Sequence, residues 1–89
     1  MNMNDYRQQL NELDGKMVGL YVQRMQIAEH IGQYKKEHGL PVKDEVRERE
    51  LLERLCAQAG EEYAAGLRSV YERIIEESCA RQYRLMNHE

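Results

Sequence analysis

The clearest pattern in the chain is a row of apolar residues whose spacing alternates between three and four positions. Arg24 interrupts this row, which otherwise contains Leu10, Leu13, Met17, Leu20, Ile27, Ile31 and Tyr34. Such spacing places side chains along one stripe of an α-helix, called the seam below. The pattern predicts a helix from about Asp5 to His38. It ends at Gly39, because a glycine followed by an apolar residue and a proline is typical of a helix C-terminus.

Two shorter helices are predicted to follow. Asp44 is a good cap for the second, which carries a modest apolar side (Val46, Leu52, Leu55, Ala59) and ends at Gly60. The third runs from about Glu61 to Met86, with a stripe of Leu67, Val70, Tyr71, Ile74, Ile75, Ser78, Gln82 and Leu85. The predicted fold class is therefore all-α, with one long N-terminal helix and two shorter ones. A chain of 89 residues predicts a single domain over 1–89.

The length of the first helix predicts an oligomer. At 1.5 Å per residue it spans on the order of 50 Å, so two shorter helices of the same chain cannot bury its whole seam. A second copy of the chain is the economical partner, and we expect an intertwined homodimer.

Composition supports helices and limits the partners. Glu, Arg, Leu, Gln and Ala are plentiful, whereas there is one Pro and no Phe or Trp. The formal net charge of −3 gives no support for binding to nucleic acid or a membrane surface. Cys56 and Cys79 form no CxxC motif and are interpreted as reduced thiols. No segment resembles a signal peptide or a membrane span, so a cytoplasmic protein is expected.

Three polar residues interrupt the apolar stripes: Arg24 in the first helix, and Ser78 and Gln82 in the third. A buried charge without a partner is costly, so Arg24 requires an anion. One interpretation is a structural ion pair with a Glu of the second or third helix. The other is a binding site for an anionic ligand.

The positions of nearby charges favour a binding site. Lys35 follows Arg24 by eleven residues, about three turns, so both project to a similar side about 16 Å apart. The second helix offers Arg47 and Glu48 in its first turn. These groups suit a compact dianion that carries a hydroxyl group.

The same inventory limits the chemistry. It contains no nucleophile–base pair and no metal-ligand cluster, and the three histidines, His30, His38 and His88, are scattered. We therefore expect no cofactor and no metal. An enzyme with this inventory would act by positioning and electrostatics.

The chain closely resembles the all-helical, AroQ-type chorismate mutases from about Arg7 to Gln82. Three segments carry the resemblance: "RQQLNELDGKMVGLYVQRMQIAEHIGQYK", "GLPVKDEVREREL" and "IIEESCARQ". The family pattern falls on Arg7, Arg24, Lys35, Asp44, Arg47, Glu48, Ser78 and Gln82, and each is of the expected type. The departures are a short connection between the second and third helices and the unusual Gly15 and Gly19.

The resemblance implies the Claisen rearrangement of chorismate to prephenate, on the route to phenylalanine and tyrosine. This reaction needs a folded substrate and stabilisation of the charge that develops on the breaking ether oxygen. The implied roles are carboxylate binding (Arg7, Arg24, Arg47, Ser78), donation to the ether oxygen (Lys35, Gln82) and binding of the ring hydroxyl (Glu48 and the Asp44 backbone).

Arg7 is expected to act in the partner's site. It precedes Arg24 by 17 residues, about 25 Å along the helix and on a different side, so one chain cannot bring both to one substrate. Two alternatives remain at this stage. One is an isochorismate–pyruvate lyase, and the other is a regulatory or dimerisation module of another aromatic-pathway enzyme.

Overall fold

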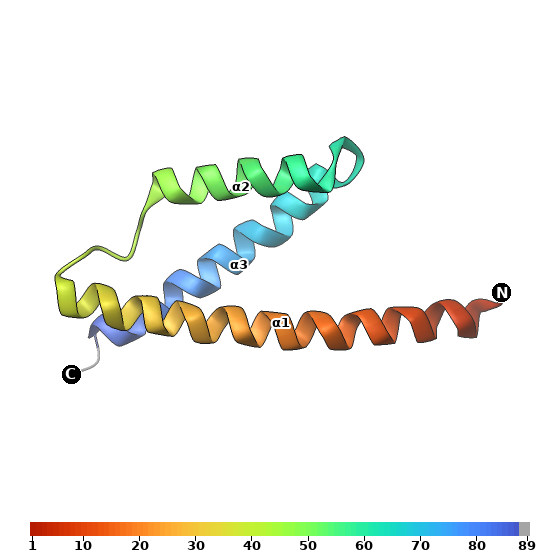
Figure 1. Ribbon diagram of the computed structural model, residues 1–89, viewed down its shortest axis with the longest axis horizontal. Helices are drawn as coiled ribbons and strands as arrows, with labels where there is room; N and C mark the ends of the chain where they lie inside the picture. Colours follow the sequence, from red (N-terminus) through yellow and green to blue (C-terminus); the bar gives the residue numbers. More distant parts are fainter. Residues whose placement is uncertain (88–89) are drawn as a thin grey trace.

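The computed structural model describes residues 1–87, which form three α-helices and no strand (Figure 1). The helices are α1 (Met3–His38), α2 (Glu45–Ala59) and α3 (Glu61–Asn87). The all-α class, the order of the helices and the great length of the first are confirmed. None of the three helices is long and apolar enough to cross a membrane, over the residues that the structure describes.

The ends of α1 are fixed by local hydrogen bonds. It begins two residues before the predicted start because Asn2 and Asp5 form a capping box, in which each side chain accepts a hydrogen bond from the other's backbone N–H. It ends at Gly39, which adopts a left-handed conformation with φ of 64°. The N–H of Leu40 then donates to the Lys35 carbonyl at 2.8 Å, closing the helix end that the sequence predicts.

The boundaries of α2 also follow the prediction. The Asp44 side chain accepts a hydrogen bond from the Arg47 N–H at 3.0 Å, which satisfies one of the free donors at the helix start. Gly60, with φ of 89°, separates α2 from α3 with a single residue. Such a short connection makes the two helices neighbours that run in opposite directions.

α3 packs against both other helices and forms the core (Figure 1). The buried residues of α1 are Met25, Ala28 and Gly32, and all lie in its second half. Each follows a position of the predicted seam (Arg24, Ile27 and Ile31) by one residue, which is about 100° around the helix. The apolar residues of the seam are therefore not the face that packs on α3, and they stay exposed in this chain.

Two apolar predictions for the shorter helices are wrong for the single chain. Val46 and Val70 are 56% and 52% exposed, whereas Leu52 and Ile75 of the same helices are buried. Val46 lies about 120° around α2 from Leu52, and Val70 lies about 140° around α3 from Ile75, so both valines are on another side of their helix.

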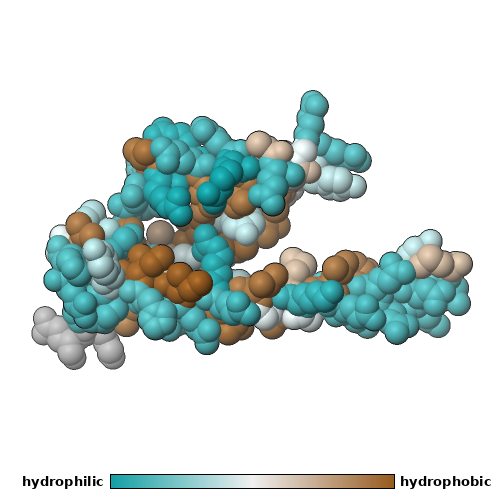
Figure 2. All heavy atoms as spheres, in the orientation of Figure 1, coloured by the Kyte–Doolittle hydropathy of each residue, from teal (hydrophilic) through white to brown (hydrophobic). Residues whose placement is uncertain are grey.

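The first half of α1 projects away from the rest of the molecule. Every residue from 1 to 23 is exposed, and the long axis of the molecule, 55 Å, matches the length of α1. Hydrophobic surface lies along this projecting arm and continues into the hollow between α1 and the α2–α3 pair (Figure 2). The exposed seam residues of the arm are Leu10, Leu13, Met17 and Leu20.

Candidate active site

A cleft of about 390 Å³ lies between the second half of α1, the α1–α2 loop, the start of α2 and the second half of α3. This volume suits a small organic ligand. Seven of the eight predicted site residues line the cleft: Arg24, Lys35, Asp44, Arg47, Glu48, Ser78 and Gln82. The structure thus brings together residues that are up to 58 positions apart in the chain.

Arg24 is held against α3 by two groups. Its Nη1 donates to the Ser78 Oγ at 2.7 Å, and its guanidinium carbon lies 5.7 Å from the centre of the Tyr71 ring. The Ser78 hydroxyl in turn donates a hydrogen bond to the Met25 sulfur at 3.9 Å. The alternative interpretation of Arg24, a structural ion pair with a Glu, is therefore not found among the described residues. A half-buried guanidinium at the cleft wall is satisfied by a hydroxyl, an aromatic face and solvent.

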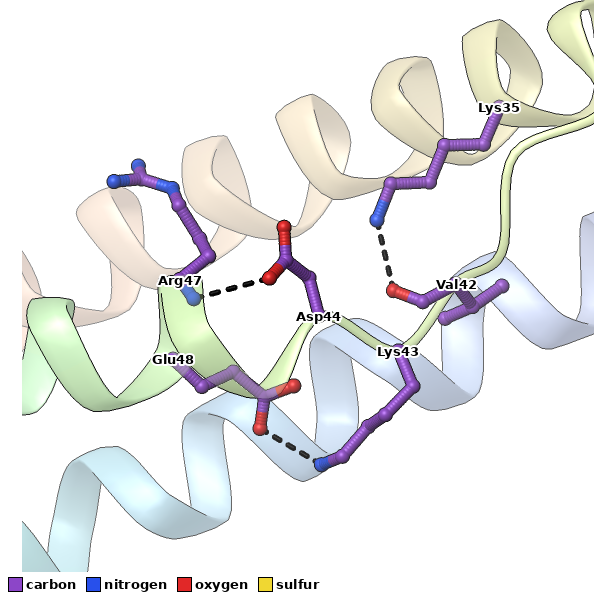
Figure 3. Close-up of polar contacts among 6 residues, drawn as sticks. All are labelled: Lys35, Val42, Lys43, Asp44, Arg47 and Glu48. Carbon is purple, nitrogen blue, oxygen red and sulfur yellow. Dashed lines mark hydrogen bonds and ion pairs between the residues drawn. The ribbon is translucent and has the colours of Figure 1, made fainter.

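Lys35 is held by the loop. Its Nζ donates to the Val42 carbonyl at 2.8 Å (Figure 3), and Val42 itself is buried. The loop residue between the two helices thus fixes the position of the ammonium group at the cleft edge. This contact comes from a main-chain atom, so no residue type in the sequence could indicate it.

Arg47 and Glu48 extend in opposite directions from the first turn of α2 (Figure 3). Glu48 accepts from Lys43 at 2.7 Å, and this hydrogen bond raises the pKa of the Lys43 ammonium. Lys43 and Asp44 are consecutive residues directly before α2. Lys43 is exposed, and nothing in the sequence indicated its pairing with Glu48.

Gln82 and Cys79 line the wall that α3 contributes. Gln82 is only 7% exposed, and its buried Oε1 has no hydrogen-bond partner among the described residues. Burial is the largest cause of the raised pKa of the Cys79 thiol, and the nearby Glu48 carboxylate raises it further. A thiol with a raised pKa stays protonated at neutral pH and is a poor nucleophile. The cleft therefore contains uncharged hydrogen-bonding groups on one side.

The charged groups of the cleft favour an anion only modestly. Arg24, Lys35 and Arg47 supply three positive charges, against two from Asp44 and Glu48. A ligand with two carboxylates would leave a deficit of positive charge in one chain alone. Arg7, the eighth predicted residue, is exposed on the projecting arm of α1 and does not line the cleft.

Other chemistry receives no support from the described residues. No group of three or more His, Cys, Asp or Glu side chains in residues 1–87 could hold a metal ion. His30 and His38 are exposed, as expected, and the His38 ring stacks on Tyr34. His88 lies outside the described residues. The lining groups that the sequence did not reveal are Ala28, Val42, Leu51 and Cys79, because none of them breaks an apolar pattern.

Comparison with known proteins gives one match. A family model described as "Chorismate mutase type II" matches residues 6–83, which is most of the chain. No curated protein and no solved structure matches the chain significantly.

Proposed function

The chain belongs to the chorismate mutase type II family, and from this premise we propose that it rearranges chorismate to prephenate in the cleft described above. One observation carries the assignment of the site: seven predicted polar residues, drawn from α1, the loop, α2 and α3, line one small cleft. The family is one of isomerases, and its reaction is intramolecular. The protein therefore has to fold the substrate and stabilise the charge that develops as the ether bond breaks.

The roles follow from the chemistry of each group. Arg24, preset by Ser78 and Tyr71, binds one carboxylate of the substrate, and Arg47 adds positive potential. Lys35 and Gln82 donate to the ether oxygen from opposite walls, one as an ammonium and one as an amide. Glu48 accepts from the ring hydroxyl, assisted by the backbone at Asp44. No step needs a metal or a cofactor.

Substrate binding exchanges bonds that the protein makes with itself. Glu48 either breaks its ion pair with Lys43 or keeps it and accepts from the ring hydroxyl with its second carboxylate oxygen. Lys35 breaks its hydrogen bond to the Val42 carbonyl and donates to the ether oxygen instead. Gln82 needs no such exchange, since neither its NH2 group nor its buried oxygen is hydrogen-bonded to the described residues. The amide is free to orient its NH2 group toward the substrate.

The functional unit we propose is a homodimer with shared sites. The exposed seam of α1 supports it, as does the deficit of positive charge in the cleft of one chain. Arg7 of the partner would supply the missing cation for the second carboxylate. The unpaired thiols of Cys56 and Cys79 support a reducing compartment, the cytoplasm.

The test is an assay on the purified protein. Chorismate absorbance should fall, and acid treatment should convert the product to phenylpyruvate. Release of pyruvate instead of prephenate would identify a lyase that uses a similar cationic pocket. A protein that leaves chorismate unchanged at micromolar enzyme concentration would refute the proposal.

A further inference from the structure

α1 and α3 come close together at Gly32, which lies on the buried face of α1. A side chain at this position would collide with α3. A Cβ atom built at this glycine would lie 3.0 Å from the Gln82 Cα, 3.2 Å from the Gln82 Cγ and 3.0 Å from the Leu85 Cδ1. One of these atoms belongs to the backbone of α3 and cannot move aside alone. A methyl group at position 32 would therefore push the two helices apart at Gln82.

The other helical glycines are different. A Cβ at Gly15, Gly19 or Gly66 would have no neighbour within 4 Å. A glycine inside a helix costs roughly 1 kcal/mol relative to alanine, so a glycine that also permits a close contact has a structural reason to be there. Within the described chain, Gly32 is the one helical glycine with that reason.

The contact bears directly on two proposed donors. Gln82 is buried but its Oε1 makes no hydrogen bond, so packing rather than bonding through that oxygen holds its side chain in place. Lys35 follows Gly32 on α1 by three residues, less than one turn. The helix spacing at Gly32 therefore sets how far the amide on α3 lies from the ammonium group on α1.

We propose that Gly32 is a positioning residue for the reaction, which sets the separation of Gln82 from Lys35 by allowing α1 and α3 to touch. The inference rests on the proposed role of Gln82 as a donor to the ether oxygen. The contacts at Gly32 require a shift of a few tenths of an ångström. Because a displacement of about 1 Å can cost about 100-fold in rate, Gly32→Ala should lower kcat roughly 3- to 10-fold. KM should change by less than about threefold, since the carboxylate-binding arginines lie elsewhere in the cleft.

A double-mutant cycle separates positioning from general loss of structure. If Gly32 acts through Gln82, Gly32→Ala combined with Gln82→Ala should have nearly the kcat of Gln82→Ala alone. Multiplicative losses in the double variant would refute the inference. The matched control is Gly66→Ala, which adds the same methyl group to an open helical position and should leave kcat unchanged in both backgrounds.

The remaining outcomes are also decisive. If Gln82→Ala itself leaves kcat unchanged, the proposed role of Gln82 is wrong. If Gln82→Ala lowers kcat but Gly32→Ala does not, only the inference about Gly32 is wrong. Should Gly32→Ala fail to fold, Leu85→Ala in the same chain removes one of the tight contacts. Recovery of the fold with kcat still low supports positioning, whereas recovery of full kcat, or continued failure to fold, refutes it.

Discussion

Most polar groups in the cleft are already held by the protein's own atoms. Arg24 bonds to Ser78, and Lys35 bonds to the Val42 carbonyl. Such contacts restrict the rotamers of long side chains before the ligand arrives, which lowers the entropy lost on binding. Gln82 differs because its buried oxygen has no partner. Its substitution therefore tests donation to the substrate with little loss of internal bonding.

Lys35→Ala should lower kcat far more than it raises KM. Its proposed contact strengthens as negative charge develops on the ether oxygen, so its loss should cost about 3 kcal/mol, roughly 100-fold or more in kcat. The measurement is steady-state kinetics on chorismate, with thermal melting as a check because the Val42 carbonyl also loses its donor. An unchanged kcat with a raised KM would mean that Lys35 binds only the ground state. Arg54→Ala, an exposed cation on α2, is the control.

Gln82→Glu should give an enzyme that is active in acid and inactive toward neutral pH. A carboxylate can only accept hydrogen bonds, whereas a protonated carboxyl group donates to the ether oxygen as the amide does. The measurement is kcat against pH beside the parent enzyme. A flat profile would remove Gln82 from the site.

The sequence reveals those site residues that break a pattern. Arg24, Ser78 and Gln82 could be found because each replaces an apolar residue in a helical stripe. The partners of Lys35 and Glu48 could not be found in this way. The Val42 carbonyl is a main-chain atom, and Lys43 lies in a loop that has no periodicity. Whether the Val42 carbonyl and Lys43 lie beside the site depends on tertiary packing, which the periodicity of the sequence does not describe.

At the scale of elements, the loop between the end of α1 and the start of α2 forms part of the cleft. The Gly39 turn ends α1 and the Asp44 cap starts α2, so the backbone between them is fixed at both ends. The helix types and most boundaries were predictable because their signals are local: glycine in the left-handed conformation, and a short acidic side chain before the first turn. The capping role of Asn2 was missed because the sequence before the first apolar residue carries no periodic signal.

Asp44→Ala should destabilise the protein by about 1 kcal/mol, because the first turn of α2 loses the acceptor for the Arg47 N–H. Asp44→Asn keeps an acceptor at the same place and should retain stability within a few tenths of a kcal/mol. Urea denaturation of the two variants beside the parent measures the difference. Equal losses in both would show that the charge of Asp44, rather than its capping oxygen, stabilises the helix.

At the scale of the molecule, one chain does not form a compact unit. Its radius of gyration is 16.3 Å, whereas a compact domain of this length has about 12 Å. The two faces of α1 explain this difference. Met25, Ala28 and Gly32 pack on α3, while the seam one residue earlier has no cover within the chain. The sequence predicts the seam, but the face that packs internally could not be separated from it, since the two lie only about 100° apart.

Mixing two inactive variants tests the shared site. Arg7→Ala and Arg24→Ala homodimers should each be nearly inactive, because every site in either lacks one arginine. Co-refolding equal amounts gives about half heterodimers, and each of these has one site with both arginines and one with neither. Activity should therefore return to roughly a quarter of the parent value. The control mixes either variant with itself. A fully exchanged mixture that stays inactive would place both arginines in the same chain's site, whereas an active Arg7→Ala homodimer would place Arg7 outside any site.

The projecting arm of α1 also has a consequence for biosynthesis. Residues 1–23 leave the ribosome before α2 and α3, yet no part of the described chain covers them. Because most helical stability in proteins comes from tertiary packing, the arm stays a fluctuating helix while α2 and α3 are made and pack onto the second half of α1. If the proposed homodimer forms, this half of α1 is translated before the core but becomes ordered after it, when two chains meet.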